Sequence, residues 1–294
     1  MRLLLSFSVF ICTEVLAQTQ ETLLARHPAN DRYASYSPDS RHIVFESDRN
    51  GNWDIFLMDK HGGNVRQLTT DTSAERSPAW HPSGKSVVFE SKKEGKNRLY
   101  TCEIETGKIS PIVMEGIPQG DVIFGRYSPD GGRLAFSQQY ADTVFHLFLL
   151  ELTTSNWRQL NSGNSRFTYP AWSPDGKSIA FHARHETQGK DDEIYWMNLK
   201  TGKMRRLTHR PNHDFCPAIS PNGKWVAYAA SMENKLPVEI FMVKKNGKGR
   251  RRITQNDLSE VLPSWRPDGK ALLVSAWRDG NFEVCEIAWT RMPG

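Results

Sequence analysis

The sequence predicts an all-β protein, a six-bladed β-propeller made of four-stranded antiparallel blades. Three observations predict this fold. A turn containing proline recurs six times in the 294 residues, each repeat holds several short runs typical of strands, and the two chain ends carry complementary parts of one repeat. A period of 44 to 47 residues with several strands per repeat favours a propeller over a two-layer sandwich.

The recurring turns read SPDS, HPSG, SPDG, SPDG, SPNG and RPDG. Proline presets the first central dihedral angle of a turn, Asp or Asn accepts hydrogen bonds from nearby backbone, and Gly adopts the left-handed conformation that ends a tight hairpin. Each turn therefore predicts a hairpin between the first two strands of a blade. Their prolines are Pro38, Pro82, Pro129, Pro174, Pro221 and Pro267.

The remaining strands follow each turn in a constant order. A second strand is predicted in runs such as HIVFES and SIAFHA, and a third in runs such as DIFLMD and EIYWMN, because both are rich in β-branched and aromatic residues. A short fourth strand ends in RQLT, RQL, RRLT or RRIT after a Gly or Asn turn. Four strands per repeat are the content of one propeller blade.

A large apolar residue stands two positions before each proline. Side chains of this kind bury large areas between neighbouring sheets, so we expect them to act as wedges between blades. The alternative is a platform on which a ligand stacks. The six residues are Tyr36, Trp80, Tyr127, Trp172, Ile219 and Trp265.

The chain ends predict how the ring closes. Leu207 and Ile253 of the fourth strands lie 14 residues before the next proline, and Leu24 lies 14 residues before Pro38. The last repeat ends after FEVCEIAW without a fourth strand of its own. We therefore expect the ETLLAR segment to pair with the last repeat, so that residues 18–294 form one propeller domain without an open sheet edge.

Residues 1–17 are expected to be a signal peptide. Arg2 precedes an apolar run, and Val15-Leu16-Ala17 offers small residues where signal peptidase requires them. The apolar run is too short to span a bilayer, since a membrane helix needs about 20 such residues. The mature protein is therefore expected to be periplasmic or secreted, without a transmembrane segment. No disulfide framework is expected from Cys102, Cys216 and Cys285.

The net charge of +5 is concentrated in short stretches, of which Lys244 to Arg252 is the densest. In an exported protein such a stretch is expected to be a solvated edge, and an acidic partner or a membrane surface is the alternative. Nucleic acid is not an expected partner. We expect a monomer.

The repeat, which reads SPDG, IAF, EIY and RLT in residues 173–208, resembles the TolB-like β-propeller repeat over nearly all of the chain after Gln18. The resemblance implies the propeller fold. It leaves function open, because similar blades occur in periplasmic TolB, in propellers fused to serine peptidases and in some sugar-processing enzymes. The separate N-terminal α/β domain of full-length TolB is not expected here.

A first candidate site lies where the inner strands begin, seven residues before each proline. Four of the six residues there are acidic in a basic chain: Asp31, Glu75, Asp214 and Glu260, beside Val122 and Phe167. At the mouth of a channel, such carboxylates could hold a cation or a basic peptide end. The alternative is structural, namely loop capping or pairing with neighbours such as Arg32 and Arg76.

A second candidate site lies in the loops of the fourth and fifth blades. There, histidines and acids could supply nitrogen and oxygen ligands to a metal ion, although their spacing matches no metal motif. The residues are His185, His209 and His213, with Asp191, Asp192 or Asp214. This site would suit a metal-dependent enzyme, similar to a polysaccharide lyase, that acts on an acidic saccharide.

An acid also opens most third strands, at Asp54, Glu193, Glu239 and Glu283, and this repetition indicates an architectural role. The sequence contains no G-x-S-x-G elbow, H-E-x-x-H helix or P-loop. We therefore assign no catalytic residue and expect no cofactor beyond a possible channel-bound cation. The first hypothesis is a non-enzymatic module that binds a protein or peptide partner of the cell envelope at its channel mouth.

Overall fold

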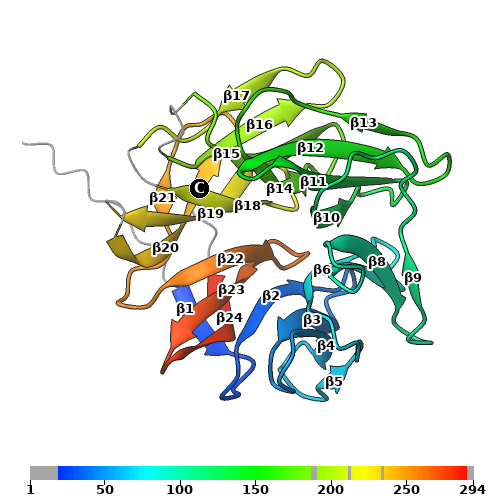
Figure 1. Ribbon diagram of the computed structural model, residues 1–294. Helices are drawn as coiled ribbons and strands as arrows, with labels where there is room; N and C mark the ends of the chain where they lie inside the picture. The colour runs from blue at the N-terminus through cyan, green and yellow to red at the C-terminus, as the bar shows by residue number, and fades with distance from the viewer. Residues whose placement is uncertain (1–18, 187–190, 211–212, 233–234, 290–294) are drawn as a thin grey trace, which may run out of the picture.

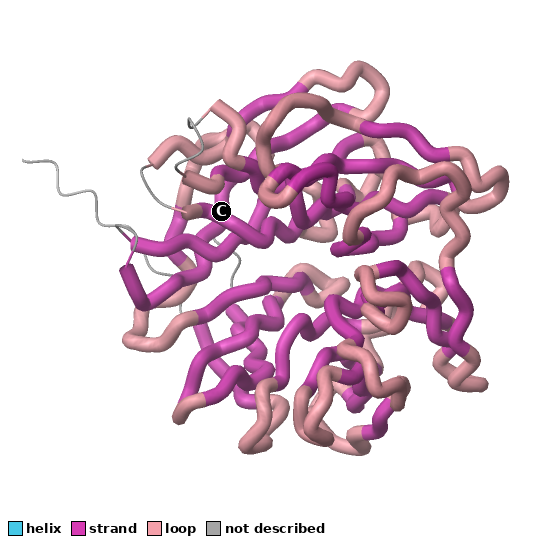
Figure 2. Tube along the Cα trace, viewed as in Figure 1, coloured by secondary structure: helices cyan, strands magenta, loops and turns pink. Residues whose placement is uncertain are grey.

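The computed structural model describes residues 19–186, 191–210, 213–232 and 235–289. In these residues, 24 strands form six four-stranded antiparallel sheets around a central axis (Figure 1). Figure 2 shows strands joined by loops in this part of the chain. The predicted six-bladed propeller is confirmed. No helix in the described residues has the length and apolar character that a membrane span requires.

The first three blades follow the chain order. Blade 1 comprises β2 (Asp31–Tyr36), β3 (His42–Ser47), β4 (Asp54–Asp59) and β5 (Arg66–Gln67). In blade 2 the strands are β6 (Glu75–Trp80), β7 (Ser86–Ser91), β8 (Arg98–Glu103) and β9 (Ile109–Pro111). Blade 3 contains β10 (Val122–Tyr127), β11 (Arg133–Ala141), β12 (Val144–Glu151) and β13 (Trp157–Gln159).

Blades 4 and 5 repeat this order. Blade 4 holds β14 (Phe167–Trp172), β15 (Ser178–Ala183), β16 (Glu193–Asn198) and β17 (Met204–Arg206). Blade 5 holds β18 (Asp214–Ile219), β19 (Trp225–Met232), β20 (Lys235–Lys244) and β21 (Arg251–Arg252). The first strand of each blade is its inner strand, and each inner strand contacts the inner strand of the next blade around the axis.

Blade 6 combines the two ends of the chain. It contains β22 (Glu260–Trp265), β23 (Ala271–Arg278) and β24 (Asn281–Trp289), and its outer strand is β1 (Thr19–Leu23). Thr19 pairs with Trp289 and Leu23 with Cys285, and the N–H of Leu24 donates to the carbonyl of Val284 at 2.9 Å. The predicted closure is confirmed. The expected signal peptide lies outside the described residues.

The proline turns have the chemistry that their residues predict. In the first turn, the Ser37 hydroxyl donates to Asp39 at 2.6 Å and accepts the N–H of His42 at 3.0 Å. The last turn residue is left-handed, with φ of 71° at Gly84 and 59° at Ser40, which replaces glycine in the first turn. Because these turns join the inner and second strands, they gather at one end of the axis, which we call the turn face.

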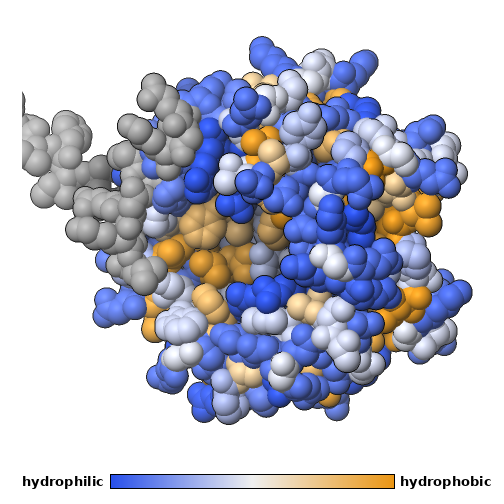
Figure 3. Space-filling model, viewed as in Figure 1, coloured by the Kyte–Doolittle hydropathy of each residue, from blue (hydrophilic) through white to orange (hydrophobic). Residues whose placement is uncertain are grey.

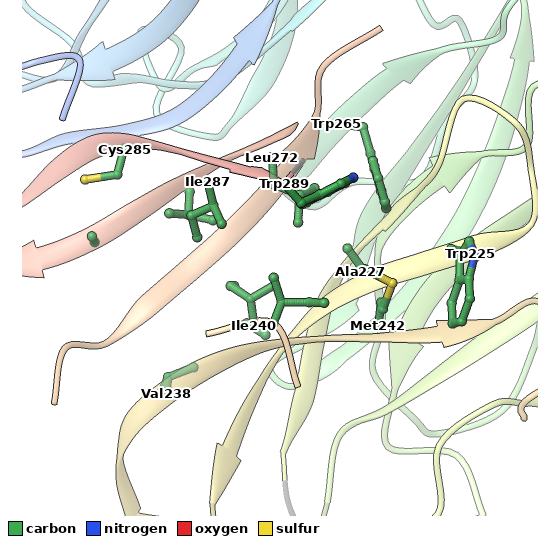
Figure 4. Packing of buried hydrophobic residues seen from close by; sticks show 14 residues of the cluster. Trp225, Ala227, Val238, Ile240, Met242, Trp265, Leu272, Cys285, Ile287 and Trp289 are labelled. Atoms are coloured by element: carbon green, nitrogen blue, oxygen red, sulfur yellow. The ribbon is translucent and has the colours of Figure 1, made fainter. Parts of the chain in front are cut away.

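The hydrophobic core is divided among the junctions between neighbouring blades. Between blades 5 and 6, Ile240 and Met242 of β20 face Leu272 and Ile287 of the last blade (Figure 4). The wedges also cross these junctions. Indole N–H groups donate to inner-strand carbonyls of the preceding blade, from Trp80 to Ser35, from Trp172 to Arg126 and from Trp265 to Ala218. For these three tryptophans, the predicted packing role is confirmed.

The three cysteines among the described residues, Cys102, Cys216 and Cys285, are buried and unbridged. Cys102 and Cys285 lie in third strands, where each packs in an apolar junction. The structure therefore contains no disulfide within the described residues, as the sequence indicates.

Candidate functional site: the plugged axis and its mouth

Each inner strand carries a bulge whose central residue has a positive φ between 53° and 62°. The left-handed conformation costs a non-glycine residue about 1 kcal/mol or more. Its recurrence in all six blades shows that the bulge belongs to the blade architecture. The six residues are Tyr33, Ser77, Phe124, Tyr169, Cys216 and Leu262.

The bulge residues meet across the axis. The Tyr33 ring lies 6.4 Å from that of Phe124 and 6.2 Å from that of Tyr169, and these belong to blades 1, 3 and 4. Cys216 and Leu262 complete the cluster from blades 5 and 6. We call this cluster the axial plug, because it closes the channel that the sequence predicts. On the face seen in Figure 3, hydrophobic residues are recessed near the middle and hydrophilic residues surround them.

Polar side chains of the second strands hold the bulges in place. Glu46 accepts the backbone N–H of Ser77 at 2.7 Å, and Glu90 accepts that of Phe124 at 2.7 Å. His182 stands at the same position of its strand and accepts the N–H of Cys216 at 3.3 Å. Burial lowers the pKa of His182 to about 4, so the ring is neutral and can accept this bond at neutral pH.

The four predicted mouth acids begin their inner strands, but all are buried in the junctions between blades, with exposures of 0 to 1%. Three face an acid in the preceding blade's third strand: Glu75 faces Asp54, Asp214 faces Glu193, and Glu260 faces Glu239. Burial, with the neighbouring carboxyl adding to it, raises the pKa of Glu75, Asp214 and Glu260 to about 7. A threonine contacts both acids of each pair: Thr69, Thr208 and Thr254.

The two inner strands that begin with an apolar residue lack an acid at the facing position of the preceding blade as well. Val122 comes after a blade whose third strand has Arg98 at the position of the acid, and Phe167 after one whose third strand has His146 there. Acids therefore occur at both positions of a junction or at neither. This correlation was visible in the sequence, and it supports the architectural role expected for the third-strand acids.

Asp31, at the junction that closes the ring, has a different partner. Both of its carboxylate oxygens accept a nitrogen of Arg49 at 2.9 Å. The alternative pairing with adjacent arginines is wrong for this residue, because successive strand residues point to opposite faces. Arg32 instead contacts Glu46 at 2.8 Å. Ligand binding by the four acids stays a prediction.

Arginines border the end of the axis where the inner strands begin, which we call the mouth. The guanidinium of Arg32 stacks 4.1 Å from the Trp53 ring, and that of Arg76 lies 4.8 Å from the same ring. Beside them a hollow of about 560 Å³, the mouth cleft, reaches Tyr33 and Phe124 of the plug. Lys92 also lines the cleft. Sequence reasoning missed Trp53, Glu46 and Glu90, although FES recurs in the second strands of blades 1 and 2.

The predicted metal ligands are only partly brought together. His213 lies 3.2 Å from Asp192, which also binds Arg184, whereas His185 lies beside Glu186 and the Phe167 ring. Among the described residues, no group of three or more His, Cys, Asp or Glu side chains is arranged to hold a metal ion. His209 is exposed. The metal-dependent alternative stays a prediction.

The basic stretch from Lys244 to Arg252 divides into two parts. Lys244, Lys245 and Lys248 are exposed, as expected for a solvated edge. Arg250 instead stacks 3.7 Å from the Phe241 ring, and Arg252 binds Glu239 at 2.6 Å. The arginines of this stretch therefore support the blade, and the lysines supply its free charge.

These features define a closed β-propeller with an axial plug and a loop-lined mouth. The family model described as the TolB beta propeller domain matches residues 8–122 and 118–238, which is more than half of the chain. The chain belongs to this family.

Individual relatives agree with this assignment. A Tol-Pal system protein TolB of Anaeromyxobacter dehalogenans is 31% identical over 122 residues, which are 42% of this chain and 27% of that protein. The match thus spans about a quarter of the relative's length. A putative TolB structure from Agrobacterium tumefaciens has a TM-score of 0.73 at 17% identity, with coverage of 93% of this chain and 98% of the other.

An oligogalacturonate lyase structure from Vibrio parahaemolyticus is also similar. It has a TM-score of 0.63 at 12% identity and covers 93% of this chain and 97% of the other. At such identities, the two structural similarities are evidence for the fold alone.

Proposed function

We propose that this protein is a non-enzymatic exported propeller, periplasmic or secreted, that binds a protein or peptide partner of the cell envelope at its mouth. The observation that carries the proposal is the pair of arginines stacked on Trp53 beside the mouth cleft. A rigid ring of blades that presents clustered loops is suited to protein recognition. The similarity to a Tol-Pal system protein supports a role in the envelope.

The charges at the mouth favour an acidic segment of the partner. Of the site residues predicted from the sequence, the carboxyls of Asp31, Glu75, Asp214 and Glu260 are buried, whereas Arg76 is exposed and Arg32 is partly exposed. Exposed Lys92 adds a third positive charge at the cleft. Arginine suits this task because its planar guanidinium can stack on an aromatic ring and bind a carboxylate with two hydrogen bonds.

The test is charge reversal at the exposed positions, since Arg32 also neutralises buried Glu46 and its loss would disturb the fold. Arg76→Glu combined with Lys92→Glu should weaken partner capture from envelope extract at least about tenfold. In the wild type, partner capture should fall steeply as the salt concentration rises. Captured proteins are identified by mass spectrometry, and the affinity of each purified candidate is then measured. The control is Lys200→Glu with Lys203→Glu, which reverses two exposed charges in the hairpin between β16 and β17.

Equal binding by wild type and the mouth variant would contradict the proposal. So would an equal loss in the control variant, because that result would indicate a general effect of net charge. Thermal unfolding of both variants within a few degrees of the wild type establishes that the fold is intact.

A further inference from the structure

A second hollow lies on the other side of the axial plug, towards the turn face. It has a volume of about 320 Å³, and Tyr33, Tyr169 and Leu262 of the plug form its base. Tyr33 lines both this hollow and the mouth cleft, so the plug separates the two. We call the second hollow the turn-side funnel.

The funnel exists because the fifth residue of most inner strands is small. Five of the six are Ser or Ala, which leave space around the axis: Ser35, Ala79, Ala171, Ala218 and Ser264. The sixth residues, which are the wedges, form the rim, and five of these six are Trp or Tyr. The rim is therefore largely aromatic, as in many small-molecule sites.

Arg126 occupies the remaining fifth position and is the single charged residue that lines the funnel within the described part of the chain. Its guanidinium donates to the carbonyl of Gly125 at 2.8 Å and to that of Ser77 at 3.3 Å, and it lies 5.1 Å from the Tyr169 ring. No carboxylate of the described residues lies within 4 Å of it. The Tyr169 hydroxyl also contacts Arg126, so its partners are two carbonyls and a phenol, none of which carries a negative charge at neutral pH.

Glu90 interacts electrostatically with Arg126, but its carboxyl is hydrogen-bonded to the plug. Its oxygen accepts the N–H of Phe124, and burial raises its pKa to about 7 in spite of Arg126. Glu90 is therefore not a full counter-charge at neutral pH. A partly buried guanidinium without an ion pair has unused donors that favour an anion.

We propose that the turn-side funnel binds a small organic acid, with its carboxylate on Arg126 and a flat apolar body between the aromatic rim residues. The volume suits a small ligand, since such pockets begin at about 300 Å³. The apolar body would replace water against Tyr and Trp faces, and the carboxylate would form charge-assisted hydrogen bonds. This site lies at the opposite end of the axis from the mouth, so the proposal is independent of the proposed partner binding.

The test uses the whole protein and three probes, namely benzoate, octanoate and 2-naphthoate, measured by calorimetry and tryptophan fluorescence. We expect 2-naphthoate to bind at least about tenfold more tightly than neutral 2-naphthamide, because the amide lacks the charge that Arg126 recognises. Arg126→Gln should remove this preference. Arg158→Gln, which changes an arginine of outer strand β13, is the matched control and should retain it.

A second variant protects the test if Arg126→Gln disturbs the plug. Ala218→Leu keeps the arginine but fills the funnel, and it should weaken 2-naphthoate binding at least about tenfold. The proposal is overturned if none of the three acids binds saturably below about 10 mM. It is also overturned if the amide binds as tightly as the acid, or if Ala218→Leu leaves the affinity unchanged.

Discussion

The carboxyl of Glu260 in blade 6 lies against that of Glu239 in blade 5, and Thr254 contacts both of them. Glu239 is further held by Arg252 at 2.6 Å, whereas Glu260 accepts the amide N–H of Asn256 and has no ion pair among the described residues. One Glu260 oxygen is buried without a partner. The pair is therefore asymmetric. Arg252 contacts Glu239, and burial raises the pKa of Glu260 to about 7.

The stability of the protein should fall as the pH rises from about 4.5 to 7. Glu75, Glu90, Asp214 and Glu260 have folded-state pKa values of about 7, above the ordinary 3.8 to 4.5 of the unfolded chain. In this pH range the folded state thus binds more protons, so raising the pH favours unfolding. His182 acts in the opposite direction, but it is one group against four. Thermal unfolding measured from pH 5 to pH 8 checks this.

Replacing the protonated member of a pair should stabilise the protein at high pH. Glu260→Gln keeps the shape and removes the cost of ionising a buried acid, which is at most about 3 kcal/mol for a pKa of 7 in place of 4.5. We expect a higher melting temperature at pH 8 and little change at pH 5. Glu239→Gln is the contrast, since it leaves Arg252 unpaired and should destabilise at both pH values. The same response from both variants would contradict the assignment.

Removing the closing strand should open the ring. A chain that begins at residue 27 lacks β1 and the backbone bond from Leu24, so the edge of β24 is exposed. We expect the free energy of unfolding, which is about 5–15 kcal/mol for a typical domain, to fall by several kcal/mol. We also expect the shortened chain to aggregate. Calorimetry and size-exclusion chromatography measure both effects.

The control for strand removal is a chain that begins at residue 18, which keeps β1 and should retain full stability. A synthetic peptide of residues 18–27 added to the shortened chain should restore part of its stability by pairing with β24. Full stability of the shortened chain without peptide would show that β1 contributes nothing to closure.

The tryptophan wedges should contribute through their indole N–H as well as their area. Trp172→Phe keeps most of the ring but loses the bond to the carbonyl of Arg126, so the free energy of unfolding should fall by about 1–2 kcal/mol. Trp277 is 44% exposed, and Trp277→Phe should change the free energy of unfolding by less than about 0.5 kcal/mol. Denaturant titration compares the two variants.

Elemental analysis tests the metal-dependent alternative directly. Since the described residues bring together His213 and Asp192 but no third ligand, we expect far less than one transition-metal ion per purified chain. A stoichiometric metal that is lost in His185→Ala with His213→Ala would contradict this and favour the enzyme hypothesis.

The architecture could be predicted because its signals are local and repeated. The spacing of Leu24 from Pro38 matches that of the fourth strands, and this was enough to place β1 in blade 6. The depth of the acids could not be predicted in the same way, because the direction of a side chain at a strand end depends on the bulge two residues later. No glycine in the sequence indicates the positive φ of this bulge, because the bulge residue is Tyr33 in one blade and Leu262 in another.

The same limit hid Arg126. In the sequence, Arg126 is one arginine among many. Its side chain lines the funnel because the residues at the equivalent positions of the other blades are small. Glu46 and Glu90 stood in a recurring FES pattern, but their bonds to Ser77 and Phe124 depend on left-handed backbone in the next blade. Contacts of this kind follow from three-dimensional structure that local sequence does not encode.

The clustered rings of Tyr33, Phe124 and Tyr169 also divide the axis of the propeller into two ends. These side chains fill the middle of the ring, so the mouth cleft and the turn-side funnel are two separate hollows. The molecule therefore has two vestibules that can evolve separately.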